Sequence, residues 1–283
     1  MNNEIFTTNK KINDTKIVLI SDIHYYEGYK QKTLDKLLNQ TIQATPNYIC
    51  IAGDILDTSN EQNLDQLYEW LNKLSSIAPT LVVLGNHDEK YGHMGNWKHK
   101  INKEYIKQLN NINNLYLLDD KNKIFDDINF YGFNLSYNYY EANDEKYSIF
   151  EDEVKELNPK FKKDTYNIIL FHSPINIYKY INNNPNHPFN ECDLILSGHM
   201  HNGCLPFWIT NIINKLFKST RSLISPLKRF FPKHAQGRIY KIKDGYVYQG
   251  VNKLSHSTLF FHKFDFLFRK NIQIITIKKN TKN

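Results

Sequence analysis

Short apolar runs alternate with amphipathic stretches along the first third of the chain. The runs 16–21, 48–52 and 80–84 are rich in branched apolar residues, which is typical of buried strands. Between them, apolar residues recur three or four positions apart, which predicts one buried face on each of two helices. These positions are Leu34, Leu37, Leu38 and Ile42 in the first helix and Leu64, Leu67, Leu71 and Leu74 in the second. This order of strands and helices predicts an α/β fold.

The rest of the chain predicts a second series of elements. They are strands at 115–118, 129–132, 166–171, 193–196 and 271–277, a helix near 97–109, a hairpin over 238–251, a polar loop over 134–150 and a frayed tail over 278–283. The first 16 residues are polar, so we expect no signal peptide. Because there is no internal repeat and no long linker, residues 1–283 are predicted to form a single domain.

Residue types that bind metal ions follow five of the predicted strands. These strand ends are Asp22-Ile23-His24, Gly53-Asp54, Gly85-Asn86-His87, His172 and Gly198-His199-Met200-His201. In open α/β sheets ligands bind at the carboxyl ends of the strands, so we expect these side chains to gather at one edge. Asp22, Asp54 or Asn86 alone would more simply be a helix N-cap. Repetition of the pattern at five strand ends favours a metal site instead.

The candidate ligands combine carboxylate, imidazole and amide groups without a thiolate. They are Asp22, His24, Asp54, Asn86, His172, His199 and His201. Two metal ions need about this many protein ligands if each keeps an open position. The mixture favours two divalent ions, Mn²⁺ first, with Fe or Zn²⁺ as alternatives. Asp54 is the natural bridging ligand. We expect a hydroxide activated by both metals to attack phosphorus and His87 to protonate the leaving group.

Five motifs of the chain resemble those of the calcineurin-like metallophosphoesterases. They are Asp22-x-His24, Gly53-Asp54-x-x-Asp57, Gly85-Asn86-His87-Asp88, His172 and Gly198-His199-x-His201, in the family's order. The resemblance implies a four-layer α/β/β/α sandwich of two mixed sheets flanked by helices, with the dimetal site at its edge. The chain most resembles the bacterial YkuE/YaeI-like branch. The chain departs from that pattern at two places. It has Asp88 where family members often have Glu, and Asn202-Gly203-Cys204 where this branch usually has Gly-Gly-Gln. The second departure bears on the subfamily and the substrate.

The resemblance also implies a role for each site residue. One metal ion would be held by Asp22, His24, Asp54 and His201, and the other by Asp54, Asn86, His172 and His199. His87 would protonate the leaving group or hold the phosphate. Asp57 would contact the ligands rather than the metal ions.

The charge of the chain indicates the class of its binding partner, and its cysteine content indicates the cellular compartment. The formal net charge of +7 favours an anionic partner such as a phosphate ester, nucleic acid or acidic lipid. The three cysteines, Cys50, Cys192 and Cys204, form no CxxC pair and no disulfide framework, so we expect a reducing, cytoplasmic location. No run of about 18 apolar residues occurs, and we expect no membrane span.

A basic segment follows the last motif, at about residues 205–235. It contains Lys215, Lys218, Arg221, Lys228, Arg229 and Lys233, interleaved with bulky apolar residues, and lacks Asp and Glu. Such a stretch is typical of a helix that binds an anionic membrane surface, here the inner face of the membrane. A helical hairpin that packs its apolar face on the domain explains the same pattern equally well.

Three functions are compatible with the sequence. The first is a metal-dependent phosphohydrolase that acts on a small or a lipid-linked phosphoester. The second is a nuclease or cyclic-nucleotide phosphodiesterase, although the concentration of charge in one apolar-rich segment argues against a specific nucleic-acid partner. The third is a metal-free scaffold, which is disfavoured because every motif ligand is present. The oligomeric state and the substrate stay open.

Overall fold

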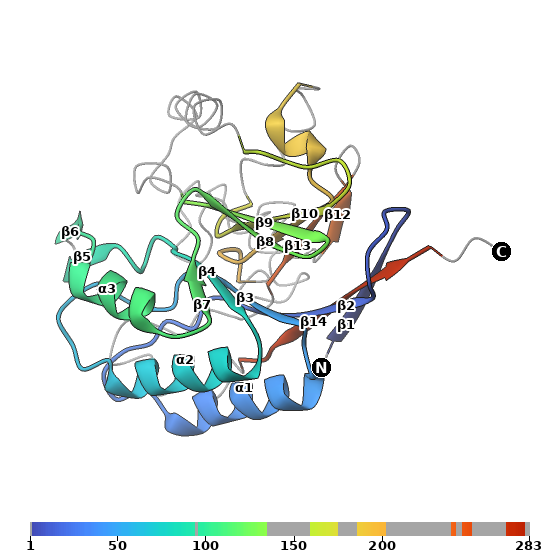
Figure 1. The fold of residues 1–283 in the computed structure, drawn as a ribbon. Coiled ribbons are helices and arrows are strands. Elements are labelled where there is room, and N and C mark those ends of the chain that lie inside the picture. The colour runs from blue at the N-terminus through green and yellow to red at the C-terminus, as the bar shows by residue number, and fades with distance from the viewer. Residues whose placement is uncertain are drawn as a thin grey trace, which may run out of the picture.

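Two mixed sheets pack face to face, and helices cover the outer face of the first sheet (Figure 1). This architecture is seen in a computed structural model, which describes residues 2–93, 96–134, 159–174, 186–201, 239–241, 245–250 and 270–280. The prediction of an α/β fold with two mixed sheets is confirmed. The single-domain prediction and the basic insertion stay predictions, because residues 205–235 lie outside the described residues.

The first sheet has six strands and carries the N-terminal half of the site. Their order is β1 (Asn2–Thr8), β14 (Gln273–Lys279), β2 (Thr15–Ile20), β3 (Tyr48–Ala52), β4 (Thr80–Val83) and β7 (Leu115–Leu117). β2, β3, β4 and β7 run parallel, so their carboxyl ends meet at one edge. β14 runs antiparallel to β2 and parallel to β1.

The second sheet carries the remaining motif residues. Its order is β12 (Ile239–Lys241), β13 (Tyr246–Gln249), β11 (Leu194–Ser197), β10 (Tyr166–Phe171), β9 (Ile128–Phe133) and β8 (Lys121–Phe125). The four central strands are parallel, and the edge strands β12 and β8 are antiparallel to their neighbours. A layer of helices was also predicted on the outer face of the second sheet. Within the described residues, the one helical element in this part of the chain is the short 3₁₀ helix η2 (Pro188–Glu191).

Alternate residues of the central strands face opposite sides, which explains their continuous apolar runs. Leu19 and Cys50 of the first sheet pack between the sheets with residues such as Leu170 and Leu196 of the second. Val18 and Ile51 point the other way, into the core beneath the helices. Burial of each such side chain contributes about 1.5–3 kcal/mol to stability. The core therefore fixes both sheets behind the edge where the motifs emerge.

Three helices flank the first sheet: α1 (Gln31–Ala44), α2 (Asp65–Ile77) and α3 (Lys103–Asn111). α1 buries Leu34 and Leu37 as predicted, but Ile42 is 51% exposed. Thr41 and Ala44 occupy the inner positions instead, because a period of 3.6 residues leads from Leu34 and Leu37 to them. The prediction that Ile42 lies on the buried face is wrong.

Several predicted boundaries are also corrected. The helix expected near 97–109 begins only at Lys103, because residues 96–99 form β6 (Asn96–His99) in a hairpin with β5 (Lys90–His93). Instead of only a turn between 118 and 129, the chain forms the strand β8. β14 continues through Lys279 into the tail expected to be frayed. The β12–β13 hairpin is confirmed, and the predicted loop over 134–150 lies almost entirely outside the described residues.

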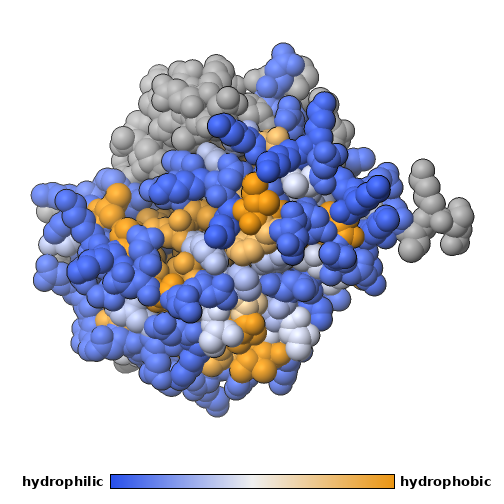
Figure 2. Space-filling view, viewed as in Figure 1, coloured by the Kyte–Doolittle hydropathy of each residue, from blue (hydrophilic) through white to orange (hydrophobic). Residues whose placement is uncertain are grey.

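The exposed large apolar side chains lie apart from one another on the surface. Ile5, Ile42, Ile124 and Ile239 are at least 40% exposed and lie on four different elements. The face in Figure 2 is mainly hydrophilic with separate apolar areas. Single exposed apolar residues are common on protein surfaces. Within the described part of the chain, no helix has the length and apolar character needed to cross a bilayer.

Candidate metal centre

The loops that follow β2 and β3 continue the pairing of their strands. The Asp22 N–H donates to the Gly53 carbonyl at 3.1 Å, and the His24 N–H donates to the Asp54 carbonyl at 3.0 Å. These bonds carry the parallel register past the end of the sheet. The first two motifs therefore lie side by side, with Asp22, His24 and Asp54 almost completely buried.

Five of the seven candidate ligands have left-handed backbone conformations. The φ angles are 54° at Asp22, 51° at His24, 50° at Asp54, 67° at His199 and 49° at His201. Each costs a non-glycine residue roughly 1–2 kcal/mol, because Cβ approaches the following carbonyl oxygen. Such strain persists only where the surrounding structure imposes it, and it clusters at functional sites. Of the nine non-glycine residues with positive φ in the described part of the chain, these five are motif residues.

The motif glycines make room for these side chains. A Cβ atom at Gly53 would lie 2.5 Å from Nδ1 of His172, and one at Gly198 would lie 2.8 Å from Oδ2 of Asp22. At Gly85 it would collide with Oδ1 of Asp54. Gly53 also has a φ of 77°, which favours glycine. These glycines allow the backbone to approach the candidate ligands closely.

The candidate ligand atoms form two groups that share Asp54. Asp22, His24, Asp54 and His201 each place one ligand atom within 4.8 Å of the others, and Asp54 does the same with His172 and His199. Oδ2 of Asp54 lies 3.2 Å from Nε2 of His172 and 3.7 Å from Nε2 of His24. The two groups contain the residues that the resemblance assigned to each metal ion, except Asn86, whose residue type the grouping does not include. The role of each residue as a metal ligand stays a prediction.

The donor atoms present fit divalent metal ions. Among the described residues, Oδ2 of Asp22, both ring nitrogens of His24 and Oδ1 of Asn86 are buried without a hydrogen-bond partner, and Oδ2 of Asp54 makes no hydrogen bond but is paired with His172. A buried polar atom left unsatisfied costs about 1–3 kcal/mol. Coordination by these atoms would offset that cost. Carboxylate, imidazole and amide donors suit Mn²⁺, Fe or Zn²⁺.

Three of the candidate histidines are held in the neutral form that binds metal ions. Burial lowers the pKa of His24, His199 and His201 below the ordinary value. His172 differs: burial again opposes the charged form, but the Asp54 carboxylate prevails and raises the pKa to about 9. Nδ1 of His172 lies 2.7 Å from the Ala52 carbonyl, which can only accept, so Nδ1–H donates. Nε2 therefore faces Asp54.

The loop after β4 is tied to the other loops through two carboxylates. The His87 N–H donates to Oδ1 of Asp54, and the Asp88 carboxylate accepts from the N–H groups of Gly85 and Leu56, all at 2.8 Å. Burial, followed by the negative charge of Asp54, raises the pKa of Asp88 to about 7. Asp88 was singled out in the sequence only as a departure from Glu. The structure shows that it joins two ligand loops.

His87 and Asp57 lie against the first group of ligands. Nδ1 of His87 donates to the Asp57 carbonyl at 2.7 Å, while Oδ1 of Asp57 lies 3.5 Å from Nδ1 of His24. The His87 side chain is 14% exposed, more than the side chains of His24 and Asp57 beside it. Burial lowers the pKa of His87. Because Nδ1–H is engaged, Nε2 is the atom that could carry a proton to a substrate.

Sequence reasoning missed one buried charged residue at the site. Lys270 is 3% exposed, and its Nζ donates to the Asp22 carbonyl at 2.5 Å. Nothing in its local sequence indicates this contact, because the two residues are separated by 248 positions. The basic residues predicted to bind a membrane or substrate, Lys215, Lys218, Arg221, Lys228 and Arg229, lie outside the described residues.

Two groups of buried carboxylate and imidazole side chains that could hold metal ions thus share Asp54 at the carboxyl edge of an α/β sandwich. Consistent with this, the model of the calcineurin-like phosphoesterase family matches residues 15–203, more than half of the chain. The chain belongs to this family, and the predicted family is confirmed.

Curated relatives agree with the family assignment. An uncharacterized metallophosphoesterase of Campylobacter jejuni is 26% identical over 190 residues, 67% of this chain and 45% of the relative. A bovine transmembrane protein with a metallophosphoesterase domain is 27% identical over 68% of this chain and 41% of its own length. Phosphodiesterase YaeI of Escherichia coli is 27% identical over 77 residues, 27% of this chain and 28% of YaeI, which supports the predicted branch. The chain thus spans less than half of these relatives.

Proposed function

We propose that the chain is a metal-dependent phosphohydrolase that cleaves a phosphoester with water activated at two divalent metal ions. The observation that carries this proposal is the pair of buried ligand groups that share Asp54. Mn²⁺ is the first candidate metal, with Fe or Zn²⁺ as alternatives, on the chemistry of the donor set. When bound, the ions would supply a nucleophilic hydroxide near neutral pH and neutralise charge on the phosphate.

The protein side chains hold the reacting groups and move the proton. Asp22, His24, Asp54 and His201 would hold one ion, and Asp54, Asn86, His172 and His199 the other. His87 protonates the leaving group through Nε2, because its Nδ1–H is fixed on the Asp57 carbonyl. Oδ1 of Asp57, 3.7 Å from Nδ1 of His87, stabilises the protonated ring.

A substrate panel tests the proposal. Protein loaded with Mn²⁺ is assayed on p-nitrophenyl phosphate, bis-p-nitrophenyl phosphate, cyclic nucleotides and single-stranded DNA, beside Asp54→Asn. We expect hydrolysis of at least one ester, which requires metal and is lost in the variant. Equal activity of Asp54→Asn would rule out the bridging role. Fewer than one bound metal per chain, with no activity after reloading, would favour a non-catalytic scaffold.

Diester hydrolysis is a second candidate function. It is favoured by the similarity to a protein named phosphodiesterase YaeI. The same residues would accept either ester, because the metal ions they would hold supply the same activated water for attack on phosphorus in both. In the panel, faster turnover of the diester than of the monoester would select this alternative.

A membrane-surface substrate is the finer form of the proposal. The basic segment at 205–235 and the bovine relative, named a transmembrane protein, support it. Sedimentation with anionic liposomes tests it against a variant in which Lys215, Lys218, Arg221, Lys228, Arg229 and Lys233 become Gln. We expect binding to be lost in the variant, and equal binding by both proteins would remove the hypothesis and the proposed position at the inner membrane face.

A further inference from the structure

We propose that Lys270 is a positioning residue that holds Asp22 in the first group of candidate ligands. The inference rests on the proposed function, because the position of Asp22 bears on the chemistry only if that group binds a metal ion. Lys270 belongs to none of the five motifs and precedes β14 at the far end of the chain. It is nevertheless as buried as the motif residues.

The sheet register brings Lys270 to the catalytic edge. β14 runs antiparallel to β2, and Gln273 pairs with Leu19. The same register, continued by three residues, places Lys270 opposite Asp22 just beyond the carboxyl end of β2. The hydrogen bond from Nζ of Lys270 to the Asp22 carbonyl, at 2.5 Å, spans this position. The C-terminal strand is thereby linked to the first ligand loop.

Three contacts hold Asp22 in its left-handed conformation. Its N–H donates to the Gly53 carbonyl at 3.1 Å, its Oδ1 accepts from the His199 N–H at 2.9 Å, and its carbonyl accepts from Lys270. Its Oδ2 is buried and makes no hydrogen bond within the described part of the chain. The three contacts therefore orient the residue and leave Oδ2 for a ligand. Lys270 supplies the contact that stands furthest away in the sequence.

Helix α1 fixes the backbone from the Lys270 carbonyl to Ile272. Nζ of Lys36 donates to the Lys270 carbonyl at 2.9 Å and to Oδ1 of Asn271 at 2.7 Å. The Ile272 N–H donates to Oε1 of Gln40 at 3.2 Å. Because the backbone immediately after Lys270 is tethered to α1, the lysine side chain is held toward Asp22.

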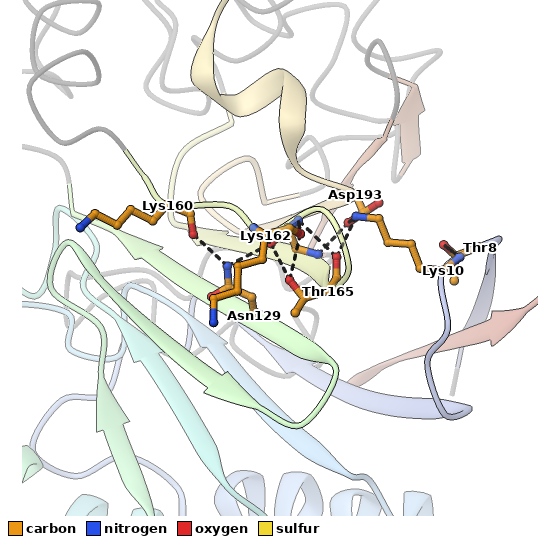
Figure 3. A network of polar contacts seen from close by, with 8 residues as sticks. Thr8, Lys10, Asn129, Lys160, Lys162, Thr165 and Asp193 are labelled. Atoms are coloured by element: carbon orange, nitrogen blue, oxygen red, sulfur yellow. Dashed lines mark hydrogen bonds and ion pairs between the residues drawn. The ribbon is translucent and has the colours of Figure 1, made fainter.

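Lys10 provides a matched control at the opposite end of the sandwich. Its Nζ donates to the Thr165 carbonyl at 2.7 Å and to Oδ2 of Asp193 at 2.6 Å (Figure 3). Thr165 and Asp193 precede β10 and β11, the strands whose carboxyl ends lead to His172 and His199. Both lysines therefore bind a main-chain carbonyl, but only Lys270 does so at the candidate metal centre.

In the test, metal-free protein is titrated with Co²⁺, and binding is measured by calorimetry and by visible absorption. The wild type is expected to show two binding events, and His201→Ala identifies the event that belongs to the first group. Lys270→Met is expected to weaken that event by about 10- to 100-fold and leave the other unchanged. Lys270→Arg, which keeps the charge and the donor, is expected to restore part of the affinity. Lys10→Met is expected to lower the melting temperature without changing either event.

The outcomes separate the inference from the proposed function. Unchanged Co²⁺ affinities in Lys270→Met would overturn the positioning role. The same conclusion would follow if Lys10→Met weakened both binding events as much as Lys270→Met does. A wild type that binds fewer than two ions would contradict the proposed function instead. If Lys270→Met does not fold, Lys36→Met replaces it, because it releases the segment from the surface of α1. A smaller loss confined to the first event is then expected, and no loss would overturn the inference.

Discussion

Oδ2 of Asp54 lies 3.2 Å from Nε2 of His172, and the two side chains form a buried ion pair. Although burial acts against both charges, the positive charge of His172 and then of His87 holds the pKa of Asp54 well below its usual range. Asp54 in turn raises the pKa of His172 to about 9. Both residues belong to the group of side chains that would hold the second metal ion.

Metal binding is therefore expected to release a proton from His172. At pH 7 the ring is protonated, because its pKa of about 9 lies above the solution pH, whereas a metal ligand must be neutral. His172 should contribute about one released proton per chain at pH 7, and this contribution, which adds to the proton lost by metal-bound water, should fall toward zero as the pH rises through 9. Calorimetry in buffers of different ionisation enthalpy measures this release. A constant release between pH 7 and 10 would contradict the ion pair.

Asp54→Asn is expected to remove most of the activity. An amide in place of the shared carboxylate offers one oxygen and no charge, so the two groups no longer share a strong ligand. Metal ions supply several kcal/mol of transition-state stabilisation, which corresponds to a loss of about 10³-fold or more in kcat. Metal analysis should show at most one ion per chain. Asp35→Asn on α1, where Asp35 accepts only from Gln31 in the hydrogen bonds described, is the control and should match the wild type.

Comparison of Gly53→Ala with Gly28→Ala separates the cost of backbone strain from the cost of displacing the His172 side chain. Both glycines have positive φ angles, 77° and 90°, so each alanine should cost roughly 1–2 kcal/mol of stability. Only at Gly53 does the added Cβ meet His172; at Gly28 nothing lies within 4 Å. Both variants should melt a few degrees lower, but only Gly53→Ala should lose metal affinity in the group that contains His172. Equal metal affinity in both variants would show that the close approach is not needed.

The fold was predictable where strands are buried on both faces. β2, β3 and β10 are continuous apolar runs, and each leads to a motif residue, so their pattern and the motifs indicate the same edge. β1 and β8 were missed because edge strands bury few side chains: β1 turns Phe6 inward and leaves Ile5 exposed. Lys270 was missed for another reason. Its partner Asp22 is distant in the sequence, and only the pairing of β14 with β2 brings them together.

His87→Gln is expected to affect substrates according to their leaving groups. Glutamine can still donate to the Asp57 carbonyl, but it cannot deliver a proton to the leaving oxygen. General acid catalysis contributes about 10²- to 10⁴-fold, so kcat on an alkyl phosphate should fall by about this factor. The loss on p-nitrophenyl phosphate should be much smaller, because p-nitrophenolate leaves without protonation. Metal content should stay that of the wild type, since His87 is absent from the two groups that share Asp54 and lies only in a third group, with His24 and Asp57, which the family resemblance does not assign to a metal ion. Equal losses on both substrates, with metal content unchanged, would assign His87 to phosphate binding instead of proton transfer.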